Sequence, residues 1–158
     1  MRGMAERRIE VVYCDDIRSE LGNKHSLMGV YPADMFIDIM PVVLPKLCAW
    51  VNVVTPVGKP FDRLRVRVLH DDVTLIDTGE LIEDGSIDLP SQHDDSTQGD
   101  NGQRLMAFNF LFTISPFSVD AESSLQIVAE TEDGDMKSRR LRIRKGAPPP
   151  FTRMPLNS

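Results

Sequence analysis

The segment Ile9–Ile39, IEVVYCDDIRSELGNKHSLMGVYPADMFIDI, gives the first indication of the fold class, and its pattern recurs along the rest of the chain. A short apolar run, Ile9–Cys14, ends in an acidic pair, and a polar turn over Ser19–Ser26 follows it. A second apolar run, Leu27–Tyr31, resumes after a proline as Met35–Ile39. Two strand-like segments around a turn-rich link are typical of the start of a β-sheet. We therefore expect strands over the apolar runs and a loop between the first two.

The same pattern recurs further along the chain. Lys46–Thr55 is apolar on both faces, which predicts a strand in the centre of a sheet. Arg63–Leu69 alternates arginine with aliphatic residues, which predicts a half-buried strand, and Val73–Ile76 should pair back onto it as a hairpin. Arg104–Ile114 predicts the strongest strand. Its residues Met106, Phe108, Phe110, Phe112 and Ile114 share one face, which we expect at the centre of the core.

The final strands are predicted over Ser124–Thr131 and Met136–Lys145, joined by a turn at Asp133–Gly134. No segment favours a helix longer than one turn. Strands that recur every ~8–12 residues with turn signals between them are typical of sandwiches and barrels. The sequence therefore predicts an all-β fold, a two-sheet antiparallel β-sandwich of about eight strands, immunoglobulin-like or C2-like.

A single domain accounts for most of the chain. Its 158 residues can bury a core without a disulfide or metal to support it. We expect a frayed N-terminus over residues 1–8, one β-sandwich domain over 9–145 and an extended proline-rich tail over 146–158. Within the domain, residues 90–103 contain no apolar residue after Pro90 and predict a long, mobile polar loop.

Charge and composition narrow the classes of partner. The formal net charge is −6 at pH 7, which argues against nucleic acid because a phosphate backbone selects a positive surface. No run reaches the ~18–20 apolar residues of a membrane span, and the N-terminal MRGMAERRIE lacks the apolar core of a secretory signal. We expect a cytoplasmic protein with neither nucleic acid nor a membrane as its partner.

Metal binding is an alternative and not the first expectation. Cys14 and Cys48 lie in apolar runs without a CxxC spacing, so we expect two buried, reduced thiols. The acidic pairs Asp15–Asp16, Asp71–Asp72 and Asp94–Asp95 could offer oxygen ligands to calcium, as the loops of C2-like domains do. Their spacing matches no calcium-loop signature, and aspartate is common in turns. We therefore assign no cofactor and no metal-ligating residue.

Catalysis is the least favoured class. The three histidines, His25, His70 and His93, stand in no local signature of nucleophilic catalysis. An enzyme would need His25 or His70 to converge with an aspartate in a concave pocket. We expect no catalytic residue and three solvated histidines.

Arginines alternate along two of the predicted strands and could form an interaction surface. They are Arg63, Arg65 and Arg67 on one strand and Arg140, Arg142 and Arg144 on the other. Neighbouring strands would join the two stripes into a basic patch that suits an anionic partner. Otherwise the arginines pair with carboxylates such as Glu130 and Glu132 across the last hairpin.

Two further features could serve an interaction. The charged motif Asp15, Asp16, Arg18 and Glu20 is either a binding site at a strand end or an ion-pair network that fixes the first turn. Three apolar residues, Phe151, Met154 and Leu156, stand on the proline-rich tail. That tail is either a disordered terminus or a segment that lies on a neighbouring subunit or an exposed strand edge.

The combination of YCDDIRSE, GNKHSLMGVY and LPKLCAWV resembles a family of small bacterial and prophage-type proteins that is catalogued as a domain of unknown function. The resemblance lies in residues 9–55, and the matching positions are Asp15, Asp16, Arg18, Glu20, Lys24, Gly29, Tyr31, Pro45 and Leu47. The family implies no reaction or cofactor. It implies a phage or prophage-derived setting, and therefore a place in the virion if the chain is phage-encoded. Phe117–Lys145 is similar to the final hairpin of many immunoglobulin-like or C2-like sandwiches, which is an analogy of fold alone.

Three hypotheses follow. The first is a non-catalytic structural or protein–protein interaction module that belongs to a larger assembly, with a protein partner or self-assembly. The second is a ligand- or calcium-binding module that uses the acidic loops. The third is an enzyme of unrecognised type.

Overall fold

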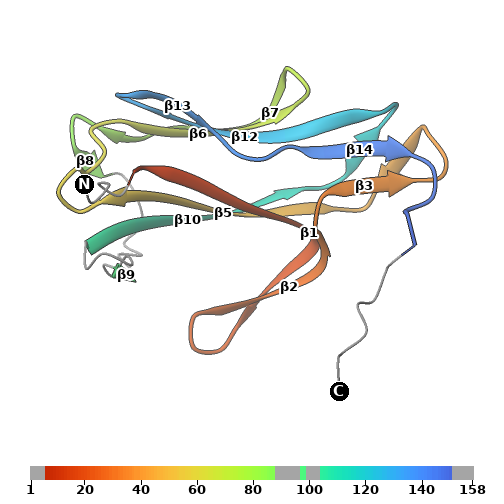
Figure 1. Cartoon of the computed structure of the whole chain (residues 1–158), viewed down its shortest axis with the longest axis horizontal. Coiled ribbons are helices and arrows are strands. Elements are labelled where there is room, and N and C mark those ends of the chain that lie inside the picture. The colour runs from red at the N-terminus through yellow and green to blue at the C-terminus, as the bar shows by residue number, and fades with distance from the viewer. Residues whose placement is uncertain (1–5, 88–96, 99–103, 151–158) are drawn as a thin grey trace.

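The computed structural model describes residues 6–87, 97–98 and 104–150. In these ranges every regular element is a β-strand, so the predicted all-β class is confirmed. The described ranges contain no helix that is long and apolar enough to cross a membrane. The strands form two main layers, one above the other in Figure 1.

The lower layer is a five-stranded antiparallel sheet. Its order is β2 (Lys24–Tyr31), β1 (Arg8–Glu20), β5 (Leu47–Pro56), β10 (Arg104–Ile114) and β9 (Thr97–Gln98). β5 lies between β1 and β10, so the central place predicted for Lys46–Thr55 is confirmed.

The upper layer is a seven-stranded sheet. Its order is β3 (Asp34–Ile37), β14 (Leu141–Lys145), β12 (Ser123–Thr131), β6 (Leu64–His70), β7 (Val73–Glu83) and β8 (Ser86–Ile87), with β13 (Gly134–Lys137) also paired to β12. β14 and β3 pair in parallel, so the prediction of purely antiparallel strands is wrong at this edge. The alternation of residues along a strand carries no information about the direction of its neighbour. β4 (Val42–Leu44) and β11 (Phe117–Val119) form a separate two-stranded sheet.

The hydrophobic core fills the space between the layers. Val51 and Val53 of β5 and Ile127 of β12 have no exposed surface. The aromatic face of β10 points inward as predicted, but Phe108 and Phe110 are only partly buried against the core. The prediction that this face is the centre of the core is therefore wrong, because the apolar residues with no exposed surface lie on other strands, such as β5, β6 and β12.

Several strand boundaries differ from the sequence predictions, and β1 and the last predicted strand show this most clearly. β1 continues to Glu20, whereas the apolar run ended at Cys14. The predicted strand 136–145 is divided into β13 and β14. Between them, the buried hydroxyl of Ser138 accepts a hydrogen bond from the Ile127 N–H at 3.0 Å and donates to the Arg139 carbonyl at 2.9 Å. Such interruptions raise the number of strands above the predicted eight.

The N-terminal residues that the structure describes are anchored. We expected residues 1–8 to be frayed, but β1 begins at Arg8 and the side chain of Arg7 is only 7% exposed. Arg7 pairs with Glu132 at 2.5 Å and with Asp133 at 3.0 Å. Its guanidinium also lies over the ring of Phe61, 4.4 Å from the centroid. Residues 1–5 lie outside the described ranges.

Two predicted segments lie largely outside the described residues. Of the loop 90–103, only the short strand β9 is described. Of the tail 146–158, residues 146–150 are described and form no strand, and the Gly146 N–H donates to the Ile37 carbonyl at 3.0 Å. Phe151, Met154 and Leu156 lie outside the described part.

Candidate interaction surfaces

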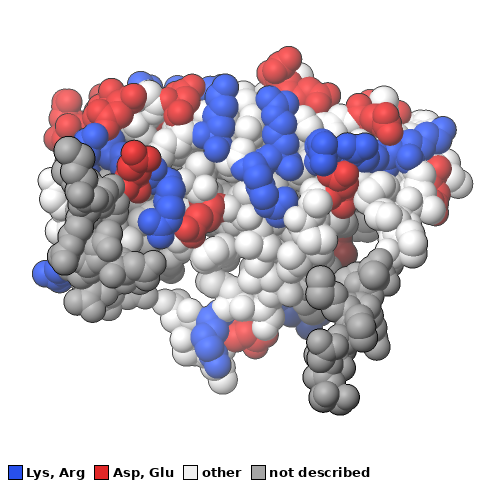
Figure 2. All heavy atoms as spheres, viewed as in Figure 1, with Lys and Arg blue, Asp and Glu red and all other residues white. Residues whose placement is uncertain are grey.

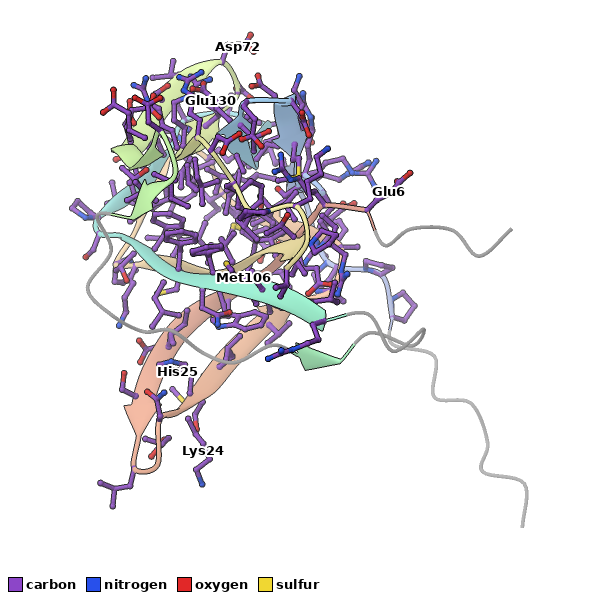
Figure 3. All side chains as sticks on the ribbon, turned by 90° about the vertical axis from the view of Figure 1, so that its left-hand side faces the viewer. Glu6, Lys24, His25, Asp72, Met106 and Glu130 are labelled. Carbon is purple, nitrogen blue, oxygen red and sulfur yellow. The ribbon has the colours of Figure 1, made fainter. Side chains whose placement is uncertain are left out.

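A two-stranded arm projects from the lower layer. The pairing of β1 with β5 ends at Cys14, whereas its pairing with β2 continues to Glu20 and Lys24. Residues 15–31, which we call the arm, therefore extend beyond the sheet, as Figures 1 and 3 show from two directions. Leu21 at its turn is 94% exposed. A two-stranded hairpin alone is marginally stable in water, so the arm depends on the contacts at its root.

Asp15, Gly29 and Tyr31 form the first root contact. Gly29 has a φ of 65°, and a Cβ there would lie 2.7 Å from the Asp15 Cγ. The Asp15 carboxylate thus crosses over the bare Cα of Gly29 and accepts a hydrogen bond from the Tyr31 hydroxyl. Burial, together with this bond to a carboxylate, raises the pKa of Tyr31 above its ordinary value. Asp15, Gly29 and Tyr31 therefore form one structural contact at the root of the arm.

Asp16 forms the second root contact. Its carboxylate is 2.5 Å from the Lys46 ammonium and 3.6 Å from the Arg18 guanidinium. The hydrogen bond from Lys46 lowers the pKa of Asp16. Further along the arm, the Ser26 hydroxyl donates to Glu20 at 2.9 Å. Asp15, Asp16, Arg18 and Glu20 thus make three separate contacts within the arm and at its root, with Tyr31, with Lys46 and with Ser26.

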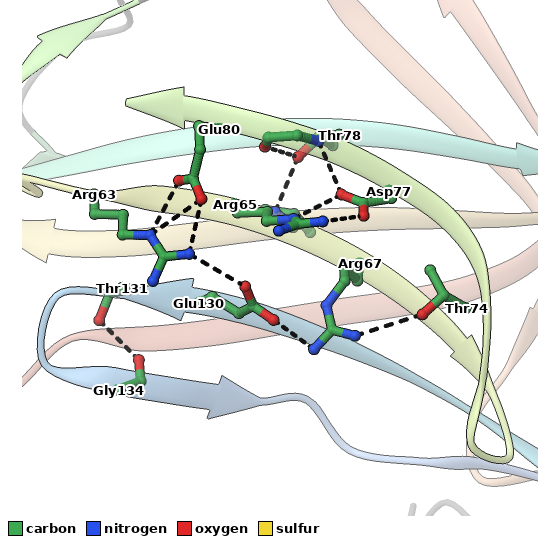
Figure 4. Close-up of polar contacts among 12 residues, drawn as sticks. Arg63, Arg65, Arg67, Thr74, Asp77, Thr78, Glu80, Glu130, Thr131 and Gly134 are labelled. Atoms are coloured by element: carbon green, nitrogen blue, oxygen red, sulfur yellow. Dashed lines mark hydrogen bonds and ion pairs between the residues drawn. The ribbon is translucent and has the colours of Figure 1, made fainter. Parts of the chain in front are cut away.

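The first arginine stripe is matched residue by residue with acids (Figure 4). Arg63 lies 2.8 Å from Glu80, Arg65 pairs with Asp77, and Arg67 lies 2.5 Å from Glu130. The hydrogen bond from Arg65 holds the pKa of Asp77 well below its usual range. Glu130 was a predicted partner, but the β7 acids were not, because their strand was predicted to end at Ile76. Glu132 instead pairs with Arg7.

The second stripe is less completely paired. Arg142 and Arg144 share one carboxylate, that of Asp34, each at 2.9 Å. Arg140 donates to the Ser124 hydroxyl at 3.3 Å. β12 lies between β6 and β14, so the two stripes are not adjacent and the condition for one continuous basic patch is not met. In Figure 2 the charged side chains gather over the upper layer and alternate in sign.

The outer face of the lower layer has a different character. Leu47, Ala49, Val51 and Val53 of β5 face the core, so Trp50 faces outward. Its register partners are Val12 on β1 and Leu111 on β10, and Leu111 is 43% exposed. We call this row of three the outer ladder. The sequence had placed Trp50 on a second apolar face of its strand, but did not identify that face as a surface.

Polar groups border the outer ladder on one side. Asn52, the next residue after Trp50 on the same face of β5, donates to Glu10 at 3.3 Å. The other side-chain atom of Asn52, the carbonyl oxygen Oδ1, is buried and has no hydrogen-bond partner among the described residues. A buried, unmatched acceptor therefore lies beside an apolar row in which Leu111 is exposed and Val12 and Trp50 are partly buried.

His25 and His70 do not converge, and His93 lies outside the described residues. His25 lies on the arm, as Figure 3 shows, and His70 ends β6 in the upper layer. The His70 Nε2 is 2.9 Å from the Ser123 hydroxyl, and its ring packs against Phe117. In the described ranges no carboxylate bonds to the His70 ring. The pairing of serine with histidine therefore lacks the third group that orients a catalytic base.

Neither cysteines nor acidic residues form a metal cluster in the described part of the chain. No group of three or more His, Cys, Asp or Glu side chains there could hold an ion. Cys14 and Cys48 are buried free thiols that face each other across β1 and β5. Burial raises the pKa of Cys14 to about 11, so its thiol stays protonated at neutral pH.

Comparison of the chain with protein-family models, with curated proteins and with solved structures finds no match.

Proposed function

We propose that this protein is a non-catalytic module that works by protein–protein contact, as a self-associating component of a larger assembly. The observation that carries the proposal is the arm. It extends an exposed, largely polar hairpin away from the core, and this hairpin carries three exposed apolar residues, with Leu21 at 94% exposure, Val30 at 49% and Met28 at 39%.

Apart from Tyr31 at its root, no described residue of the arm belongs to the core or packs against it. Its strands pair only with each other beyond Cys14. Two separate root contacts, one from Tyr31 and one from Lys46, nevertheless hold it in place. Exposed apolar residues on an ordered projection are typical of an interaction site.

For the fold, we infer a β-sandwich of the immunoglobulin-like or C2-like type. Two layers with a shared core support this classification, although the parallel edge at β3 and the additional short strands depart from a simple pattern of eight antiparallel strands. The phage or prophage setting and a cytoplasmic or virion location belong to the same proposal. They rest on the resemblance of residues 9–55, and neither nucleic acid nor a membrane is proposed as a partner.

The mass of the protein in solution tests the proposal. The full chain has a mass of 17.8 kDa. Light scattering after size exclusion is expected to give a defined multiple of this value. A variant in which Asn-Gly replaces residues 18–26 keeps the register pair Ile17–Leu27 and closes the hairpin with a two-residue turn. It should run as a single chain with an unchanged melting temperature.

A single-chain mass for the unmodified protein at all concentrations would rule out self-association. The variant Asp84→Asn is the control. It gives the β7–β8 turn the same Asn-Gly sequence, but in a different hairpin of the domain. That control should assemble like the unmodified chain.

A further inference from the structure

The two outer faces of the domain differ in the free-energy cost of burying them against another copy of the chain. The upper face is covered with charged pairs, and an ion pair must be desolvated when a surface is buried. The outer ladder of Val12, Trp50 and Leu111 carries no charge. Copies with a net charge of −6 repel each other. Contact through the uncharged ladder therefore costs less electrostatic and desolvation free energy than contact through the charged upper face.

The chain itself contains a segment that fits this ladder. Residues 151–158, FTRMPLNS, hold three apolar side chains, Phe151, Met154 and Leu156, and no acidic residue. Eight extended residues span roughly 26 Å, and the ladder crosses two strand spacings of about 4.8 Å each. The segment is therefore long enough to cover all three ladder residues.

The route of the chain favours a neighbour as the source of this segment. β14 runs parallel to β3, away from the arm root, and Gly146 is held against Ile37 at the far end of that pair. Trp50 lies on the other side of the root, two positions into the sheet from Cys48. Three consecutive prolines, Pro148–Pro150, are stiff and extended. In Figure 1 residues 146–150 turn at the end of β14 and run down past the end of the lower layer, and stiff prolines oppose a further turn across the outer face of the same copy.

We propose that residues 151–158 of a second copy bind across the outer ladder of Val12, Trp50 and Leu111. This inference rests on the proposed self-association and adds to the arm a second contact that the assembly requires. It assigns Phe151, Met154 and Leu156 to one surface, whereas the arm would make separate contacts.

Trp50 is the single tryptophan of the chain, so its fluorescence reports directly on the ladder. The experiment compares acrylamide quenching of Trp50 in the full chain and in the variant Phe151→Ser/Met154→Ser/Leu156→Ser, over protein concentrations from about 0.1 to 100 µM. Light scattering on the same samples gives the mass. The variant Thr152→Ala/Asn157→Ala changes polar residues of the same segment and serves as the control.

The expected result is that Trp50 is shielded in the assembled full chain and in the control. Shielding is lost on dilution and in the triple serine variant. A peptide of residues 146–158 added to that variant should restore the shielding.

A second pair of variants tests the ladder. Leu111→Ser should abolish assembly, whereas Leu75→Ser, on β7 of the upper layer and similarly exposed at 40%, should not.

Three results would overturn the inference. Equal quenching in the full chain and the triple variant would show that the segment does not cover the ladder. Shielding that persists on dilution in a single chain would show that each copy covers its own ladder. Assembly with Trp50 unshielded would disprove this surface and leave the proposed function standing.

Discussion

Asp15 and Gly29 touch across the root of the arm, because the carboxylate occupies the space that any side chain at residue 29 would need. A Cβ at this position would lie 2.7 Å from the Asp15 Cγ, and the backbone of Gly29 has a positive φ of 65°. The same carboxylate accepts the Tyr31 hydroxyl hydrogen bond. The direction in which the arm leaves the domain therefore depends on a residue without a side chain.

Gly29→Ala should destabilise the protein more than an alanine at a comparable glycine. Gly79 is the comparison, since its φ is 69° and a Cβ there meets nothing within 4 Å. Gly79→Ala should cost about 1–2 kcal/mol of unfolding free energy from the backbone alone. Gly29→Ala should cost about 3 kcal/mol, because the steric clash adds to that strain. Urea unfolding measures both values.

The double variant Asp15→Ala/Gly29→Ala separates the two causes. If the carboxylate is the obstacle, the double variant should lose less stability than the sum of the single variants. Strict additivity would show that the backbone strain at Gly29 acts without Asp15.

Arg7 should be important to stability although it precedes the first strand. Arg7→Met keeps much of the apolar length but removes a charge that is 7% exposed and pairs with Glu132 and Asp133. The loss of one partner of such a pair costs about 3 kcal/mol in unfolding free energy. Arg8→Met is the control, since Arg8 is 48% exposed and pairs with the exposed Glu10. The control should stay within about 0.5 kcal/mol of the unmodified protein.

Alkaline conditions should destabilise the domain through its two tyrosines. Burial raises the pKa of both Tyr13 and Tyr31. A tyrosine whose pKa is raised in the folded state binds its proton more tightly there than in the unfolded chain. Its contribution to the stability of the fold is complete below the unfolded pKa of about 10 and is lost as the pH rises above that value. Phenolate absorbance should therefore appear only with unfolding. Tyr31→Phe should flatten the fall of the melting temperature above pH 10. Phenolate absorbance from a still folded protein at this pH would contradict the prediction.

Acid should remove the stabilisation that the ion pair of Arg65 with Asp77 provides. The hydrogen bond from Arg65 lowers the pKa of Asp77, so the stabilisation is present above the ordinary carboxyl pKa of about 4 and is lost as pH falls below it. Asp77→Asn should lower the melting temperature at pH 7, and the difference from the unmodified protein should shrink as pH falls below about 4. Asp72→Asn, in the exposed β6–β7 turn, is the control. A difference that stays constant with pH would contradict the assignment.

The fold class could be predicted because it depends on a local property. Alternation along Arg63–Leu69 and Arg104–Ile114 places side chains on two faces, and the strands β6 and β10 follow. The parallel pairing of β14 with β3 could not be predicted, since the two strands are far apart in the chain and alternate in the same way in either direction. The extent of β1 was missed because its arm half is solvated on both sides and its residues have the polarity of a loop.

The candidate surfaces were also predictable only where they depend on local sequence. The arginine stripes were visible in the sequence, but their partners Asp77 and Glu80 lie on a strand whose length was underestimated. The outer ladder depends on the register of three strands, Val12 beside Trp50 beside Leu111, and register is a long-range property. The only available signal was an apolar second face on the strand that holds Trp50.

The parallel edge has a consequence for the synthesis of this protein. Asp34 receives both of its arginines from β14, and 108 residues separate it from Arg142. A ribosome must therefore release almost the whole domain before this edge can close, and contacts of such long sequence separation form slowly. Meanwhile β3 and β12 present open strand edges, which makes the nascent chain prone to wrong pairing. The correct folding of this domain is thus expected to depend on how well the cell protects an unfinished chain.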